Sequence, residues 1–336
     1  MNEKIICATE NDVEVAAPLT EFDVAAEIDQ RVFVASTDAH GKRLDKCLAT
    51  WVPELSRSYL TQLILMGCVQ VQGKVVNKPS SKVGAGQAVD IELRPTPEAT
   101  AFVPEALELN IVFEDPHILV INKPAGLVVH PGAGNWSGTV LNGLLHHHRG
   151  AAELPRAGIV HRLDKDTSGL MVVAKTREAM AHLVQQLAER TVQRIYLAIA
   201  SGRGQVGSEY EIDQPIARDP KNRLRMGVVP NGKPAQTHAR VLASGDGCVL
   251  MRCKLKTGRT HQIRVHLAWR GFPLIGDTLY GGRVAWGMSA QALHAHDLAL
   301  QHPATGESMH WWARPPSAWR QAALQAGLEY NEASLL

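Results

Sequence analysis

Short apolar runs, each too brief for a helix, most restrict the fold that this chain can adopt. Such runs predict buried strands, and they occur at residues 111–113, 118–121, 169–174, 196–200 and 248–252. One amphipathic helix is predicted over residues 177–190, where Met180, Leu183, Val184 and Leu187 recur at helical spacing. This order of elements predicts an α+β fold with a mixed, largely antiparallel central sheet flanked by helices and loops.

A second, smaller pattern precedes these strands, within residues 36–94. Apolar residues recur at helical spacing in residues 44–51 and again after Ser56, which is a suitable N-cap. Residues 69–71 and 89–93 alternate like strands. We therefore predict a small α/β domain ahead of the larger one.

The length of 336 residues suits about two domains. The predicted organisation, in chain order, is an acidic N-terminal tail (1–35), the small domain (36–94), a linker (95–108), the large domain (109–325) and a C-terminal tail (326–336). We expect the first tail to be mobile or to dock as a single strand. Three prolines make the linker semi-rigid.

The formal net charge of +2 is unevenly distributed. Residues 1–35 hold eight acidic and two basic side chains, a net charge of −6, so the rest of the chain carries +8. A basic body favours a polyanionic partner, because neutralising phosphates releases counterions. Ordinary solvated faces remain an alternative on charge alone.

The cysteines, histidines and hydropathy argue against several other classes of protein. None of the five cysteines forms a Cys-x-x-Cys pair, so neither a disulfide framework nor a zinc ribbon is predicted. His146, His147 and His148 are adjacent and cannot all face one metal ion, so we expect helix-end packing there and no metal. No stretch approaches the ~18 apolar residues that span a membrane. The expected protein is cytoplasmic, without a membrane segment, and a monomer.

The densest polar segment is Gly-Ile-Val-His-Arg-Leu-Asp-Lys-Asp-Thr-Ser-Gly-Leu at residues 158–170. A loop between two apolar strands is a good place to aim a carboxylate such as Asp164. Arg162 and Lys165 lie beside Asp164 in the sequence and would keep it ionised. A surface turn with local capping is the alternative, and chemistry alone leaves the two open.

This segment closely resembles the His-Arg-Leu-Asp signature of the RluA family of pseudouridine synthases. Further segments are similar to family motifs and occur in the family's order, at residues 122–131, 194–196, 257–266, 276–282 and 291–295. Residues 41–75 resemble the S4 RNA-binding domain. Within the family, the chain looks closest to the RluD type, which modifies large-subunit (23S) ribosomal RNA and carries an N-terminal S4 domain.

The resemblance implies an isomerase that converts specific uridines to pseudouridine without a cofactor. Asp164 corresponds to the family's catalytic aspartate, Arg264 to the arginine that pairs with it, and Tyr196 to the tyrosine that lies against the target base. Arg162 corresponds to the residue thought to fill the gap left by the flipped nucleotide. The uridine must leave its stack, because the reacting atoms are inaccessible in a helix.

Other basic residues are expected to contact RNA. We assign Arg194 and Arg259 to the site, and Arg43, Arg57, Lys74 and Arg223 to contacts outside it. Residues 218–264 hold eleven Lys or Arg against two acids, and their first part is expected to form a mobile basic arm. We expect His261 and His266 to pack or hydrogen-bond on a strand.

The expected partner is ribosomal RNA of the large subunit, or its assembly precursor. Two alternatives remain open at this point. One is a non-catalytic RNA-binding factor for ribosome assembly that kept the fold. The other is the same chemistry on transfer RNA, for which an S4-like module is less expected.

Overall fold

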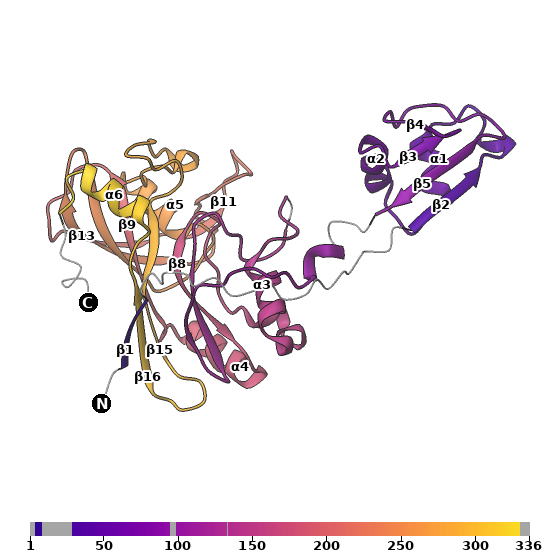
Figure 1. Ribbon diagram of the computed structural model, residues 1–336. Helices are drawn as coiled ribbons and strands as arrows, with labels where there is room; N and C mark the ends of the chain where they lie inside the picture. The colour runs from indigo at the N-terminus through magenta and orange to yellow at the C-terminus, as the bar shows by residue number, and fades with distance from the viewer. Residues whose placement is uncertain (1–3, 9–28, 95–98, 133, 330–336) are drawn as a thin grey trace. The chain divides into compact units, whose positions relative to one another are not determined.

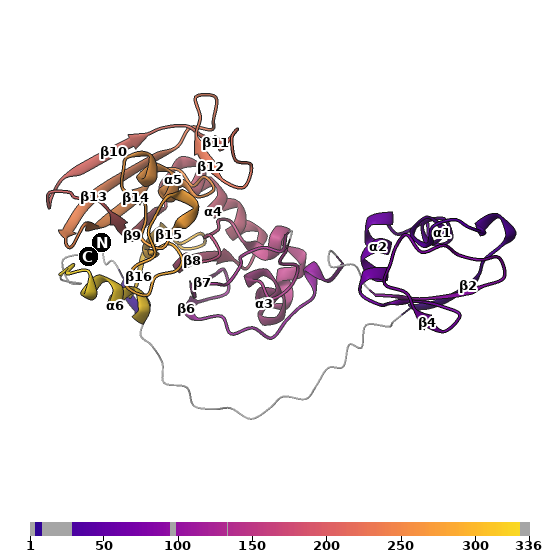
Figure 2. The same ribbon diagram turned by 90° about the horizontal axis from the view of Figure 1, so that it is seen from above.

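The computed structural model describes residues 4–8, 29–94, 99–132 and 134–329 of the chain (Figures 1 and 2). These residues form two compact units, which divide between Ala101 and Phe102. Residues 4–8 belong to the second, larger unit. Most of the predicted N-terminal tail (1–3 and 9–28), part of the predicted linker (95–98) and the last residues (330–336) lie outside the described residues.

The large unit is built on a mixed sheet of ten described strands. Its order is β10-β13-β14-β9-β15-β8-β7-β6, with β16 paired to β15 and β1 to β16. Only the pairs β15–β8 and β1–β16 are parallel among these strands, which confirms the predicted mixed, largely antiparallel sheet. The strands are β1 (Lys4–Ala8), β6 (Ile111–Glu114), β7 (Ile118–Lys123), β8 (Ser168–Ala174), β9 (Gln193–Ser201), β10 (Glu209–Asp213), β13 (Gln236–Ser244), β14 (Cys248–Leu255), β15 (Leu293–Gln301) and β16 (Ser308–Ala313).

Helices cover both faces of this sheet. On one face, α3 (Val140–His147) and α5 (Gln262–Trp269) share an apolar core with Tyr196 of β9. On the other, α4 (Arg177–Glu189) packs on the β7–β8 region and α6 (Ser317–Gln325) packs on Leu197 of β9. Because alternate residues of a strand face opposite sides, Tyr196 and Leu197 belong to different layers. The predicted helix over 177–190 is confirmed as α4.

The parallel contact between β8 and β15 depends on Gly169. Its φ is +113°, and a Cβ there would lie 2.2 Å from the carbonyl oxygen of Ala295. Only glycine permits both this backbone conformation and so close an approach. The loop that precedes β8, including Asp164, is thereby brought against the middle of the sheet.

The small unit has a sheet of order β2-β5-β3-β4 and two helices that bury one apolar core. Its elements are β2 (Asp29–Val34), α1 (Leu44–Trp51), α2 (Arg57–Leu65), β3 (Val69–Val71), β4 (Lys74–Val75) and β5 (Ala88–Leu93). Ser56 caps α2 as predicted, since its Oγ accepts from the Tyr59 amide at 3.2 Å. Strand β2 pairs with β5 along its whole length, so the small unit begins before residue 36, the predicted boundary.

Two further boundaries differ from the prediction. The predicted linker includes residues 103–108, yet these are bonded to α3. Asn142 Nδ2 donates to the Val103 carbonyl at 2.8 Å, and Glu105 N donates to the Asn142 carbonyl at 3.1 Å. These backbone contacts fasten the segment to α3. The predicted C-terminal tail begins at 326, but Ala326 and Leu328 are buried against α6.

The first part of the predicted basic arm forms a β-hairpin. Its strands, β11 (Ile216–Arg218) and β12 (Met226–Val228), are antiparallel partners. At its tip the Arg225 Nε donates to Asp219 Oδ2 at 2.8 Å. Asp219 lies close enough in space to neutralise Arg225 and stabilise the turn, which a count of charges along the sequence does not show.

Candidate active site

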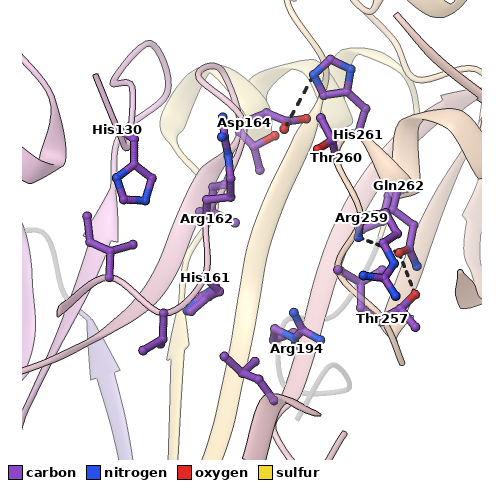
Figure 3. Close-up of a pocket in the computed structure, with 18 of the residues that line it drawn as sticks. His130, His161, Arg162, Asp164, Arg194, Thr257, Arg259, Thr260, His261 and Gln262 are labelled. Carbon is purple, nitrogen blue, oxygen red and sulfur yellow. Dashed lines mark hydrogen bonds and ion pairs between the residues drawn. The ribbon is translucent and has the colours of Figure 1, made fainter. Parts of the chain in front are cut away.

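A cavity of about 760 Å³ opens on the sheet face that α3 and α5 cover (Figure 3). Its walls come from the loop at 159–167, from β9, and from the turn at 255–261 that leads into α5. Six predicted site residues line it together: Asp164, Tyr196, Arg264, Arg162, Arg194 and Arg259. The tertiary fold therefore assembles the residues that sequence patterns could name only one segment at a time.

The loop carrying Asp164 is fastened on both sides. The Thr167 amide donates to the Asp164 carbonyl at 3.1 Å, and His161 Nε2 accepts from the Val172 amide of β8 at 3.1 Å. The buried Lys123 donates through Nζ to the Lys165 carbonyl at 2.9 Å. These contacts leave the Asp164 side chain 18% exposed, at the cavity wall.

Arg264 joins Asp164 to a second carboxylate. Its Nη1 lies 3.2 Å from Asp164 Oδ2, while Nε and Nη2 hold Asp277 at 2.7 and 2.9 Å. The guanidinium also lies over the Tyr280 ring, 5.0 Å from its centre. Two carboxylates raise the pKa of Arg264 against the opposing effect of its burial, so the group stays charged.

His261 faces the other oxygen of Asp164, with Nε2 3.9 Å from Oδ1, as the dashed line in Figure 3 marks. Its Nδ1 is 2.8 Å from the Tyr280 hydroxyl, which itself accepts from the Met226 amide at 2.9 Å. The Tyr280 oxygen accepts the hydrogen bond from Met226, and its own hydrogen can point at Nδ1. In that arrangement the proton of a neutral His261 lies on Nε2, toward Asp164.

The histidines of the cavity carry little charge near neutral pH. Burial lowers the pKa of His130 to about 4 and that of His161 to about 3. Burial also lowers the pKa of His261, against the opposing effect of the Asp164 charge. The positive charge of the cavity lining therefore comes from its arginines and Lys256.

Tyr196 and Arg194 both stand on β9, two residues apart, so their side chains leave the same face of the strand. Both residues are buried, with 6% and 8% of their surface exposed. Burial raises the pKa of the Tyr196 phenol and lowers that of the Arg194 guanidinium. Arg162 and Arg259 are more exposed, and Arg259 Nε donates to the Pro234 carbonyl at 3.1 Å.

The remaining predicted RNA contacts lie outside the cavity. Arg223 is exposed near the tip of the β11–β12 hairpin, and Lys74 is exposed on β4 of the small unit. Arg43 and Arg57 flank the buried Asp45, with Nε–Oδ1 at 3.0 Å and Nη2–Oδ2 at 2.6 Å. Hydrogen bonds from Arg43, ahead of those from Arg57, hold the pKa of Asp45 down to about 2, against the cost of its burial.

Sequence reasoning missed some residues of the site and misplaced others. Lys123, Asp277 and Tyr280 were not singled out in the sequence. Their presence inside segments that resemble family motifs was the only feature of the sequence that pointed to the site. His261 and His266 were predicted on a strand, which is wrong. His261 has a left-handed φ of +55° at the start of α5, and His266 lies within that helix. The Thr257 hydroxyl and the Arg259 amide both donate to Gln262 Oε1, at 2.7 and 2.9 Å, and close the turn there.

Among the described residues, no group of three or more His, Cys, Asp or Glu side chains could hold a metal ion. His146 and His147 end α3, and His147 Nε2 lies 2.9 Å from Glu114 Oε2. In the part of the chain that the structure describes, no helix combines the length and apolar character needed to cross a membrane.

Two family profiles match the chain. The profile of RNA pseudouridylate synthase matches residues 117–269, and that of the S4 domain matches residues 42–89. The first therefore includes Asp164, Tyr196 and Arg264, and the second includes Arg43, Arg57 and Lys74.

Curated relatives and solved structures are similar over most of the chain. Ribosomal large subunit pseudouridine synthase D of Pasteurella multocida (strain Pm70) is 49% identical over 310 residues, covering 88% of this chain and 95% of that protein. The protein of the same name from Escherichia coli (strain K12) is 48% identical, covering 85% and 92%. The structure of human RNA pseudouridylate synthase domain containing 1 aligns with a TM-score of 0.54 at 26% identity, covering 69% of this chain and 94% of that one.

Proposed function

Because this chain belongs to the RNA pseudouridine synthase family, and is thus an isomerase, we propose that it converts specific uridines of large-subunit ribosomal RNA to pseudouridine, with Asp164 as the catalytic carboxylate. The observation that carries the role of Asp164 is its pairing with Arg264 at 3.2 Å inside a cavity that Tyr196 also lines. The cavity of about 760 Å³ has room for a nucleotide that has left its stack.

The reaction breaks the N1–C1′ bond of uridine, turns the base and joins its C5 to C1′. Arg264 keeps Asp164 ionised, since a guanidinium at hydrogen-bond distance favours the carboxylate. The ionised group acts at the sugar in one of three ways: it attacks C1′, stabilises positive charge there, or removes a sugar proton. In each case Asp164 must face the sugar while Tyr196 supports the base, a stacking contact worth about 1–3 kcal/mol.

Ribosomal RNA as the substrate is supported by charge and by similarity. The part of the chain after residue 35 carries +8, which suits a phosphate backbone. The segment that matches the S4 domain presents Arg43, Arg57 and Lys74, and the β11–β12 hairpin presents Arg223. The curated relatives described above are named for the ribosomal large subunit. We place the chain in the cytoplasm, where this RNA is made and assembled.

Pseudouridine mapping in cells tests the proposal. A strain without the gene should lack pseudouridine at one or more sites of large-subunit ribosomal RNA. Wild-type protein should restore it, and Asp164→Asn should not, although that variant should still bind the RNA. Asp166→Asn is the matched control, because it makes the same change two residues along the same loop and outside the cavity lining; it should restore the modification.

The two alternatives give different results in the same experiment. A non-catalytic assembly factor would leave pseudouridine unchanged in the deletion strain, and Asp164→Asn would rescue ribosome profiles fully. A transfer RNA enzyme would lose pseudouridine from transfer RNA and leave ribosomal RNA unaltered.

A further inference from the structure

Arg194 is a buried cation in the cavity that no described residue balances. Its Nε is inaccessible to solvent and has no hydrogen-bond partner among the described residues. No described carboxylate forms an ion pair with it, whereas Arg264 in the same cavity holds two. Nη1 of Arg194 packs against Gly258, so closely that a Cβ on residue 258 would lie only 2.8 Å from it. The guanidinium therefore has a defined place in the cavity wall and unused donors.

Such an arrangement is unfavourable in the free protein. Burying an ionised group without a partner is strongly unfavourable, and burial accordingly lowers the pKa of Arg194. Buried polar groups in folded proteins nearly always have hydrogen-bond partners. A group that lacks one and lines a cavity is suited to a partner that arrives with the ligand, because the ligand's acceptor then completes the missing interactions.

The position of Arg194 indicates which part of the ligand it meets. Arg194 and Tyr196 leave the same face of β9 two residues apart, and both line the cavity that Asp164 also lines. A uracil that lies on Tyr196 inside this cavity is therefore close to Arg194, and its carbonyl oxygens can accept hydrogen bonds from the unused donors.

We propose that Arg194 donates hydrogen bonds to a carbonyl oxygen of the target uracil and stabilises the negative charge that the base acquires when its bond to the sugar breaks. This inference rests on the function proposed above. It makes Arg194 a catalytic residue that contacts the leaving base, beyond a general contact to RNA.

The charge balance of the step shows why such a cation is useful. When N1–C1′ breaks, both bonding electrons stay with the base, which becomes an anion with its charge shared by N1 and the two carbonyl oxygens. On the sugar side, the negative charge of Asp164 is used up by a new bond from its oxygen to C1′ or by a proton taken from C2′, or it is balanced by the positive charge that forms at C1′. In each case the base gains one negative charge, which a cation beside the base stabilises. Pre-placed donors at a developing anion contribute about 100- to 1000-fold in rate.

A change of leaving group tests this role. Single-turnover consumption of the target nucleotide is measured with RNA that carries either uridine or 5-fluorouridine at that position, because fluorine makes the base a more stable anion. We expect Arg194→Gln to slow the uridine reaction about 100-fold and the 5-fluorouridine reaction at least several-fold less. Arg190→Gln is the matched control, since it removes the same charge from an exposed side chain that lines the same cavity; any loss it causes should be equal for the two RNAs. If Arg194→Gln slowed the reactions of uridine and 5-fluorouridine RNA by the same factor, the proposal would be overturned. A variant that only weakened RNA binding would also overturn it and would indicate a phosphate contact.

Thermal stability of the free protein separates this role from a structural one. Arg194→Met replaces an unbalanced buried charge with an apolar side chain of similar length, so its Tm should equal or exceed that of the wild type. A lower Tm that parallels the loss of activity would show that Arg194 supports the fold instead. Wild-type protein that leaves uridine unchanged would contradict the proposed function; active wild-type protein without the leaving-group effect would contradict only the role of Arg194.

Discussion

Arg264 donates two hydrogen bonds to Asp277, with Nε 2.7 Å from Oδ2 and Nη2 2.9 Å from Oδ1. This bidentate pair orients Nη1 toward Asp164. Asp277 is nearly fully buried and lies only 13 residues after Arg264 in the chain. A planar guanidinium held at two points has little freedom left. Asp277 therefore fixes the orientation in which Arg264 meets Asp164, the proposed catalytic carboxylate.

Asp277→Asn should reduce both stability and turnover. The variant leaves the shape nearly unchanged but removes one of the two charges that balance the buried Arg264, so we expect the free energy of unfolding to fall by about 3 kcal/mol. Turnover should fall while RNA affinity is retained. Urea denaturation and single-turnover assays measure the two effects. The control, Asp219→Asn, breaks the partly exposed pair with Arg225 on the hairpin and should cost about 1 kcal/mol or less. Similar losses for the two variants would contradict this view of Asp277.

Tyr280→Phe should reduce turnover with little effect on the fold. The lost hydroxyl accepts from the Met226 amide and faces His261 Nδ1, so the ring nitrogen would no longer be held as an acceptor and Nε2–H would no longer be fixed toward Asp164. A loss equivalent to one hydrogen bond of about 1 kcal/mol corresponds to about a 5-fold fall in kcat. Tyr210→Phe, outside the cavity and packed on Phe272, is the matched change. Full activity of Tyr280→Phe would exclude a role for this contact.

His294 should make the protein less stable in acid. Burial lowers its pKa to about 3, and its two ring nitrogens are occupied by Ser168 Oγ and the Ala313 carbonyl, each at 2.9 Å. The unfolded chain has the ordinary histidine pKa of about 6.5, so between pH 6.5 and 3 it binds the extra proton and the native state does not. The free energy of unfolding should therefore fall by about 2 kcal/mol through this group from pH 7 to 5.

The variant His294→Gln should remove that part of the pH dependence, as urea denaturation at pH 5, 6 and 7 would show. His146→Gln, on an exposed residue of α3, should leave the slope with pH as it is. If the slope of His294→Gln matches that of the wild type, another group causes the acid sensitivity.

Arg57→Gln should weaken RNA binding in a salt-dependent way. Arg43 and Arg57 both pair with Asp45. The three side chains together therefore carry a net positive charge, which can contact an RNA phosphate. Loss of one phosphate contact should lower the slope of log K against log salt by about 1. Binding of ribosomal RNA by the full chain at several salt concentrations measures this slope. Arg31→Gln is the control, because Asp29 and Glu54 already neutralise Arg31; an equal change in slope for both variants would refute the assignment.

Local patterns in the sequence were sufficient for the elements that depend on near neighbours. The strands around 118–121 and 169–174, the helix α4 and the cap at Ser56 follow from periodicity and from one side chain at a helix start. Resemblance to family motifs identified Asp164, Tyr196 and Arg264, which the fold brings into one cavity. Each of these patterns is continuous in the chain, so it can be recognised without knowledge of the fold.

Only the tertiary structure decided how those motifs cooperate. Asp164 and Arg264 are 100 residues apart, and no periodicity reports a contact at that separation. The same holds for Tyr280 between Met226 and His261, and for the β11–β12 hairpin. The missing balance of Arg194 is likewise invisible in the sequence, since whether a cation has a partner depends on which side chains the folded sheet places within a few ångströms of it.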